Sequence, residues 1–133
     1  MPLALKPDTV AVVRDALLAR PAVTAIFGAR ITARLQGDVW PQLRLSTASE
    51  GEDAEPHMGE ARVTCECFGG GGTDADTASM RIAALTLFAN ARDLAGAYPS
   101  GIIVACAPLL FIPDPVPDTG RARFIVDIVV TTL

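Results

Sequence analysis

The feature that most constrains this chain is a long apolar helix, predicted over residues 75 to 95. One stripe at helical spacing consists of Met80, Ala84, Leu87, Ala91 and Leu94, and a second stripe on another side consists of Ala78, Ile82, Leu85 and Ala89. A helix that is apolar on two sides is covered on two sides. We expect a sheet of the same chain to cover the first stripe. Either the N-terminal helix or another subunit covers the second.

Alternating apolar and polar residues predict the strands of that sheet. Residues 60 to 68 place alternate apolar side chains on one face and charged or polar ones on the other, which is typical of a strand with one solvated face. Residues 42 to 47 predict a preceding strand, joined to it by a long hairpin. Residues 102 to 112, interrupted at Pro108, and residues 121 to 133 predict two more strands.

Two short helical segments come before the first strand. Asp8 is a favourable N-cap for a helix over residues 9 to 20, and Pro21 ends that helix and begins a turn over residues 22 to 27. The element order is α-β-β-α-β-β. We therefore predict one α+β domain spanning residues 1 to 133. It has a small, mainly antiparallel four-stranded sheet packed against the long helix and a short N-terminal helix.

Length, hydropathy and charge narrow the class of protein. The 133 residues suit one domain, no apolar run reaches the roughly 20 residues that span a bilayer, and no signal peptide is recognisable. We expect a soluble intracellular protein, or one released only by lysis, with no membrane partner. Residues 46 to 80 hold eight acids against one arginine, and the whole chain has a net charge of −4 and a single lysine. This balance argues against nucleic acid as the main partner.

The candidate metal ligands favour no metal. A zinc site would require Cys65, Cys67 and Cys106 with a fourth ligand, and the simpler interpretation is three small buried hydrophobic residues. The loop over residues 48 to 59 holds four acids whose spacing does not match an EF-hand. These acids are Glu50, Glu52, Asp53 and Glu55. We expect a solvated or partner-facing acidic loop, and no metal or other cofactor.

The glycine-rich turn before the long helix is the candidate phosphate site. It lacks the Gly-Lys-Ser/Thr sequence of a P-loop, and Asp74 and Asp76 already occupy the positive end of the helix. A flexible connector is the better interpretation. No serine or cysteine lies in a nucleophile motif, and the only histidine, His57, lies in the acidic loop. We therefore expect no catalytic residues and no enzymatic activity.

Four stretches of the chain carry a resemblance to a known family. They are ALLARPAVTAIFGARI at residues 16 to 31, WPQLRLS at 40 to 46, EARVTCECFG at 60 to 69 and RARFIVDIVV at 121 to 130. The order of these stretches and their residue character, over nearly the full length, resemble those of the tail-terminator proteins of long-tailed bacteriophages. These are also called tail-completion or minor tail proteins. The four consecutive glycines and the low lysine content depart from a typical member.

The resemblance implies a structural virion protein without catalytic residues. Proteins of this family form a homohexameric ring on the head-proximal end of the tail tube, where they stop tube polymerisation and offer a surface to the head. The implied partners are other copies of the chain, the major tail tube protein and the head–tail connector proteins, with DNA only as passing cargo. The implied location is the virion, after assembly in the host cytoplasm. The alternatives are a head-side connector or neck ring protein and, further away, a small cytoplasmic enzyme or ligand-binding domain.

Several segments are candidates for contacts with these partners. Arg81 and Arg92 share a face of the long helix between its two apolar stripes, and Ile125 and Val129 lie on the otherwise polar face of the last strand. We expect that face to be covered by a helix of the same chain or by a neighbouring subunit. Contacts along the tail axis are expected from the acidic loop and from residues 113 to 118. An acidic loop that lines the lumen of a ring would repel DNA phosphates. The candidate interface residues are Glu50, Glu52, Asp53, Glu55, Arg81, Arg92, Asp114, Asp118, Ile125 and Val129.

Overall fold

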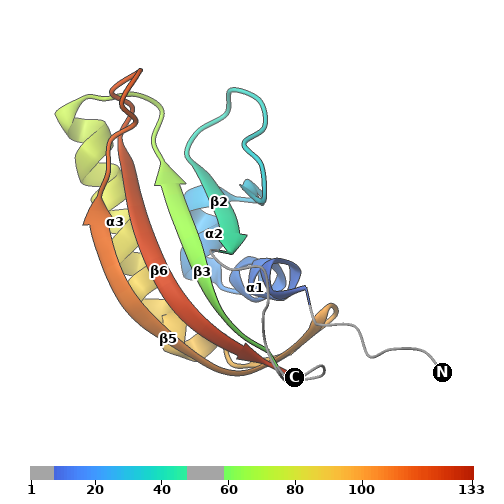
Figure 1. Ribbon diagram of the computed structural model, residues 1–133. Coiled ribbons are helices and arrows are strands. Elements are labelled where there is room, and N and C mark those ends of the chain that lie inside the picture. Colours follow the sequence, from blue (N-terminus) through green and yellow to red (C-terminus); the bar gives the residue numbers. More distant parts are fainter. Residues whose placement is uncertain (1–7, 48–58) are drawn as a thin grey trace.

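The structure is a computed structural model, and it describes residues 8–47 and 59–133 (Figure 1). The described helices are α1 (Thr9–Leu18), α2 (Pro21–Phe27), α3 (Asp74–Asn90) and the short 3₁₀ helix η1 (Ala91–Leu94). The described strands are β1 (Ile31–Thr32), β2 (Gln42–Thr47), β3 (Gly59–Phe68), β4 (Gly96–Tyr98), β5 (Gly101–Pro113) and β6 (Arg123–Thr132).

These strands form one six-stranded sheet in the order β1-β2-β3-β6-β5-β4. Strands β1 and β2 pair in parallel, and all other neighbours are antiparallel. The prediction of a four-stranded, mainly antiparallel sheet with one long and one short helix is therefore wrong. The sheet is mixed and curled, and three α-helices pack on it. Strands of two and three residues are too short to show an alternating pattern, so β1 and β4 were absent from the prediction.

Local sequence signals explain where the helices begin. The Asp8 carboxylate accepts a hydrogen bond from the Ala11 amide at 3.1 Å, which caps α1, and Pro21 occupies the first turn of α2. Thr73 and Asp76 form a reciprocal capping box at the start of α3. The long helix ends earlier than residue 95, because residues 91–94 tighten into a 3₁₀ turn.

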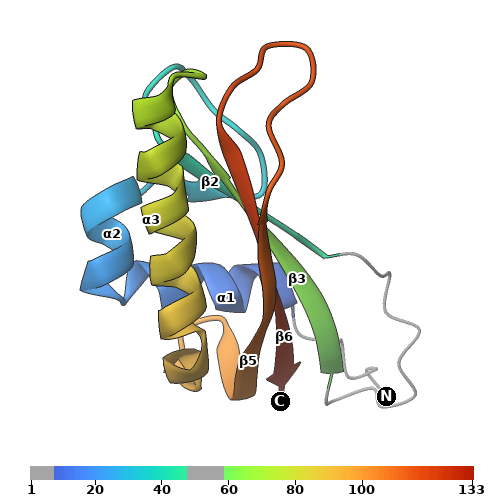
Figure 2. The same cartoon turned by 90° about the vertical axis from the view of Figure 1, so that its left-hand side faces the viewer.

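All three α-helices lie on one face of the sheet (Figure 2). The core between helices and sheet contains the predicted first stripe, which runs along α3 into η1 and whose members are at most 4% exposed. It also contains Phe124, Val126, Ile128 and Val130 of β6. Within residues 8–47 and 59–133, no helix covers the opposite face, which we call the open face. Strand β5 shows two register shifts against β6, between Ile103 and Ala105 and between Pro108 and Leu110, so the predicted interruption at Pro108 is confirmed.

Candidate functional site

The outer stripe of α3, formed by Ala78, Ile82, Leu85 and Ala89, lies opposite the buried stripe of the same helix. Ile82 is 61% exposed and Leu85 is 37% exposed, and both alanines are exposed as well. Helix α2 packs beside α3 rather than over it, with Arg20 donating a hydrogen bond to the Asn90 side chain at 3.1 Å. In the part of the chain that the structure describes, the N-terminal helices therefore leave the outer stripe uncovered.

Two arginines lie close to this outer stripe. Arg81 is seven residues before Phe88, and Phe88 packs edge-on against Phe111 of β5 with ring centroids 5.6 Å apart. Residues seven apart share a helix face, so Arg81 lies on the side of α3 that faces β5. Arg92 is exposed in η1. Neither arginine forms an ion pair or a hydrogen bond with another described residue.

The second uncovered surface is on the open face, where β5 and β6 run side by side. Ile112 pairs with Ile125, Leu110 with Asp127, and Ala107 with Val129, so these side chains project from the same face. Ile112 is 47% exposed, and Ile125 and Val129 are half-buried. We call Ala107, Leu110, Ile112, Ile125 and Val129 the open-face strip. It is apolar although no described helix lies over it.

The polar part of the open face, formed by β2, β3 and the charged residues of β6, has the opposite character, because its charges neutralise one another. Arg44 and Arg123 both pair with Glu66, at 2.7 Å and 3.2 Å, and Arg123 also pairs with Asp114 at 2.8 Å. Asp127 accepts hydrogen bonds from Arg62 at 2.7 Å and from Thr64 at 2.8 Å.

This charge network buries its own carboxylates. Glu66 and Asp127 are each only 8% exposed. The guanidinium groups of Arg44 and Arg123 also lie near the ring of Phe68, 5.3 Å and 5.6 Å from its centroid. The sequence pattern predicted Glu66 as a solvated side chain. The network was missed because it requires the register of three strands.

The remaining candidate residues lie at the end of β5 and in the acidic loop. The turn after β5 is held by the Asp114 amide, which donates to the Arg123 carbonyl at 2.8 Å, and by the Val116 amide, which donates to the Arg121 carbonyl at 3.0 Å. Asp118 is exposed and forms no ion pair with a described residue. The acidic-loop candidates Glu50, Glu52, Asp53 and Glu55 lie outside the described residues.

The glycine turn is hydrogen-bonded to the backbone segment before β6 and is not a flexible connector. The Gly69 amide donates to the Ala122 carbonyl at 2.9 Å, and the Ala122 amide donates to the Gly71 carbonyl at 2.8 Å. A Cβ at Gly72 would lie 2.3 Å from the carbonyl oxygen of Gly120. Glycine is required at position 72 because the two backbone segments approach too closely for a side chain. The expectation of a loose connector is therefore wrong.

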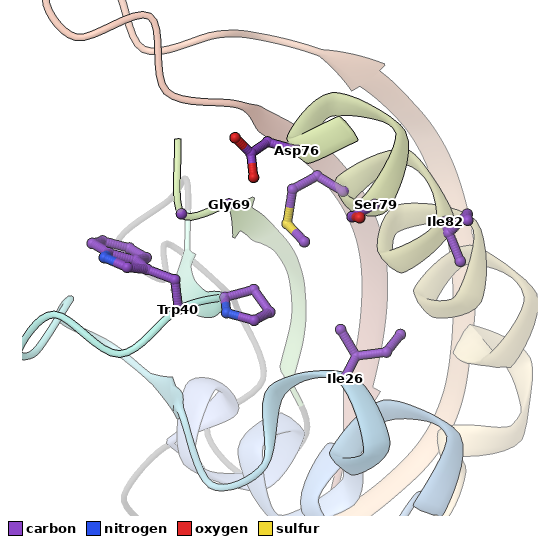
Figure 3. A pocket seen from close by; sticks show the side chains of 9 residues that line it. Ile26, Trp40, Gly69, Asp76, Ser79 and Ile82 are labelled. Carbon is purple, nitrogen blue, oxygen red and sulfur yellow. The ribbon is translucent and has the colours of Figure 1, made fainter. Parts of the chain in front are cut away.

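A cleft of about 410 Å³ lies between α2, the start of α3 and the segment before β2 (Figure 3). Among the described residues that line it, the one carboxylate is that of Asp76, which already accepts hydrogen bonds from the backbone amide and hydroxyl of Thr73 at 3.1 Å and 2.8 Å. Trp40 stacks under the guanidinium of Arg121, 4.1 Å from its ring centroid. The cleft is lined by Ile26, Trp40, Pro41, Gly69, Gly70, Asp76, Ser79, Met80 and Ile82. This lining offers apolar contact and no free acid–base pair.

The three cysteines are buried, as expected. Burial raises the pKa of the Cys65 and Cys67 thiols well above their ordinary value, and it raises the pKa of Cys106 to about 11. Nucleophilic cysteines require a lowered pKa, so these thiols are poor nucleophiles. The described residues contain no cluster of three or more His, Cys, Asp or Glu side chains that could hold a metal ion. None of the helices described is both long and apolar enough to span a membrane.

Comparison with known proteins finds likeness in structure alone. No family model matches the chain, and no curated protein matches it. Eight chains of solved structures match, and they include a chain of a structure described as "Virion of native gene transfer agent (GTA) particle". The two chains share a TM-score of 0.68 and 12% sequence identity, and the match covers 92% of each. At this identity the likeness establishes a common fold.

Proposed function

We propose that this protein is a structural component of a tailed phage or phage-like particle, and that it terminates the tail tube as a homohexameric ring. One observation carries the proposal: the fold matches a chain of a gene transfer agent virion over 92% of both chains. The sequence resemblance to tail terminators points to the same kind of particle. The specific position, at the head-proximal end of the tail, rests on that resemblance.

The described surface suits a structural role better than a catalytic one. The cleft beside α3 holds one carboxylate, which caps the helix, and the buried thiols are held in their neutral form. The two uncovered apolar surfaces suit contact with other protein chains. A net charge of −4 suits a ring through which DNA passes without binding. The proposed partners are therefore other copies of this chain, the major tail tube protein and the head–tail connector proteins.

A stop codon in this gene tests the proposal directly. In lysates of the particle that encodes the chain, we expect tails of uncontrolled length that are not joined to heads, while heads fill normally. Electron microscopy of negatively stained lysates measures both features, and supplying the intact gene in trans restores them. Tails of normal length beside heads that lack a connector would instead identify a head-side neck protein. Normal infectious particles would overturn both assignments.

A further inference from the structure

We propose that copies of this chain assemble head to tail, with the outer stripe of α3 of one copy packed on the open-face strip of the next. This inference rests on the proposed function, because both require an assembly of several copies. It specifies the contact between neighbouring copies in that assembly. Each copy would then complete a helix–sheet–helix sandwich with a helix from its neighbour.

The first argument is the direction in which the two surfaces face. The helices lie on one side of the sheet and the open face lies on the other (Figures 1 and 2). The outer stripe points away from the sheet, because the opposite side of α3 is buried against it. The two apolar surfaces therefore face in opposite directions. A chain with two different contact surfaces on opposite sides forms heterologous contacts, which generate rings when the rotation closes.

The second argument is the composition of the open face. A sheet face exposed to water normally alternates with polar residues, as the polar part of the open face does. Strand β5, by contrast, has no charged residue between Gly101 and Pro113. Its neighbours Ile125 and Val129 on β6 are apolar, and Asp127 between them is only 8% exposed and is bound by Arg62 and Thr64. For β5, this is the composition of a strand that is covered on both sides. No helix among residues 8–47 and 59–133 covers it, and the proposed cover is a helix of the neighbouring copy.

The third argument is charge, which selects a second copy in head-to-tail orientation. Arg81 and Arg92 lie near the outer stripe without ion-pair partners among the described residues. Asp114, with 44% of its side chain exposed, and the exposed Asp118 follow Ile112 at one end of the open-face strip. Placing the stripe of one copy on the strip of the next, with Arg81 towards the Asp118 end, brings an arginine towards an aspartate that has no ion pair among the described residues, whereas Asp114 already pairs with Arg123. A symmetric contact between two α3 helices would instead bring the arginines of both copies together, which is unfavourable.

Site-specific cross-linking between two differently tagged variants tests this contact. One variant carries Ile82→Cys or Leu85→Cys, and the other carries Ile112→Cys or Val129→Cys. A short bis-maleimide is added to concentrated purified protein and to isolated particles that contain both variants. The native thiols are buried and neutral, so each single variant provides its own background control. We expect mixed dimers from at least one of the four combinations, and none from either variant alone.

A pair of charge variants provides the second measurement. Ile82 and Val39 are almost equally exposed, at 61% and 62%, but Val39 lies in the segment before β2 and belongs to neither the outer stripe nor the open-face strip. Ile82→Asp is expected to weaken self-association by about tenfold or more, because it places a charge at the centre of the interface. Val39→Asp is expected to leave association unchanged. Circular dichroism verifies that both variants are folded.

The outcomes separate this contact from the proposed function. Cross-links from Ile82→Cys alone would identify a symmetric helix–helix contact and overturn the inference. Absence of mixed dimers from both samples would overturn it as well, even if the stop codon still gives overlong tails. Mixed dimers together with normal tails in the stop-codon strain would retain the contact and refute the tail-terminator role.

Discussion

Replacing Ile125 with Asp is the most informative single substitution in this chain. Ile125 is half-buried on the open face, between Glu66 of β3 and Ile112 of β5. In an isolated subunit the new carboxylate reaches solvent, so the substitution costs the partial burial of one side chain, some strand preference and repulsion from Glu66. We estimate about 1–2 kcal/mol, compared with a total domain stability of about 5–15 kcal/mol. The subunit is expected to remain folded.

In the assembled state the same carboxylate would be buried against α3 of the neighbouring copy. An unpaired buried charge costs several kcal/mol, so self-association and incorporation into tails should be lost. Phe124→Ala is the matched contrast, because Phe124 is only 5% exposed and faces the core. It should lower the free energy of unfolding by about 3–5 kcal/mol. Thermal melting measures folding, and sedimentation together with particle composition measures assembly.

Val129→Asp provides a second variant with a different local charge. Val129 lies across from Arg62 of β3, so an aspartate there gains a favourable neighbour in the isolated subunit. We expect a folded subunit that fails to assemble, as for Ile125→Asp. If both variants unfold the subunit, the open face is part of its own core and the reasoning is refuted. If both assemble normally, the face is simply solvated.

Three further substitutions or conditions test the packing of the subunit itself. Gly72→Ala should destabilise by about 1–3 kcal/mol in urea, since its Cβ would meet a backbone oxygen, whereas Gly70→Ala has ordinary contact space and should cost less. Arg123→Ala should cost about 1–3 kcal/mol, because it leaves the buried Glu66 carboxylate with Arg44 alone; equal stability would contradict the network. The Cys106 thiol should resist maleimide at pH 8 in the folded state. Because folding raises the pKa of Cys106 from 9.0 to about 11, its contribution to stability is complete below pH 9 and is lost as pH rises towards 11.

Much of the fold could be predicted from short-range signals. Asp8 and Thr73 are N-caps, Pro21 begins a helix, and alternation located β2, β3 and β6. Strands β1 and β4 could not be predicted from alternation of apolar and polar residues. Strand β1 forms by pairing with β2, and β4 forms by pairing with β5. A strand of two or three residues contains too few side chains to express a period.

The candidate site was predictable to a different extent at each surface. Helical spacing identified the outer stripe of α3, and alternation placed Ile125 and Val129 on the open face. Neither pattern could identify what covers them, because coverage depends on where distant elements pack. The Glu66 network was beyond reach for the same reason. Glu66 pairs with Arg44 of β2 and with Arg123 of β6, and Arg123 also pairs with Asp114 in the turn after β5. Only the sheet register brings these residues together.

The proline and the register shifts of β5 affect whether the edge of this strand can pair with a strand of another copy. Strand β4 pairs with β5 only over Gly101–Ile103, which leaves the outer edge of the following residues without a described neighbouring strand. An uncharged edge of this length is a template for strand addition. The proline at position 108 supplies no N–H, and the two register shifts bend the edge away from a regular row of donors and acceptors. We therefore expect the light scattering of concentrated free subunits to level off at a finite assembly and not to keep growing with time, because copies meet through side-chain surfaces.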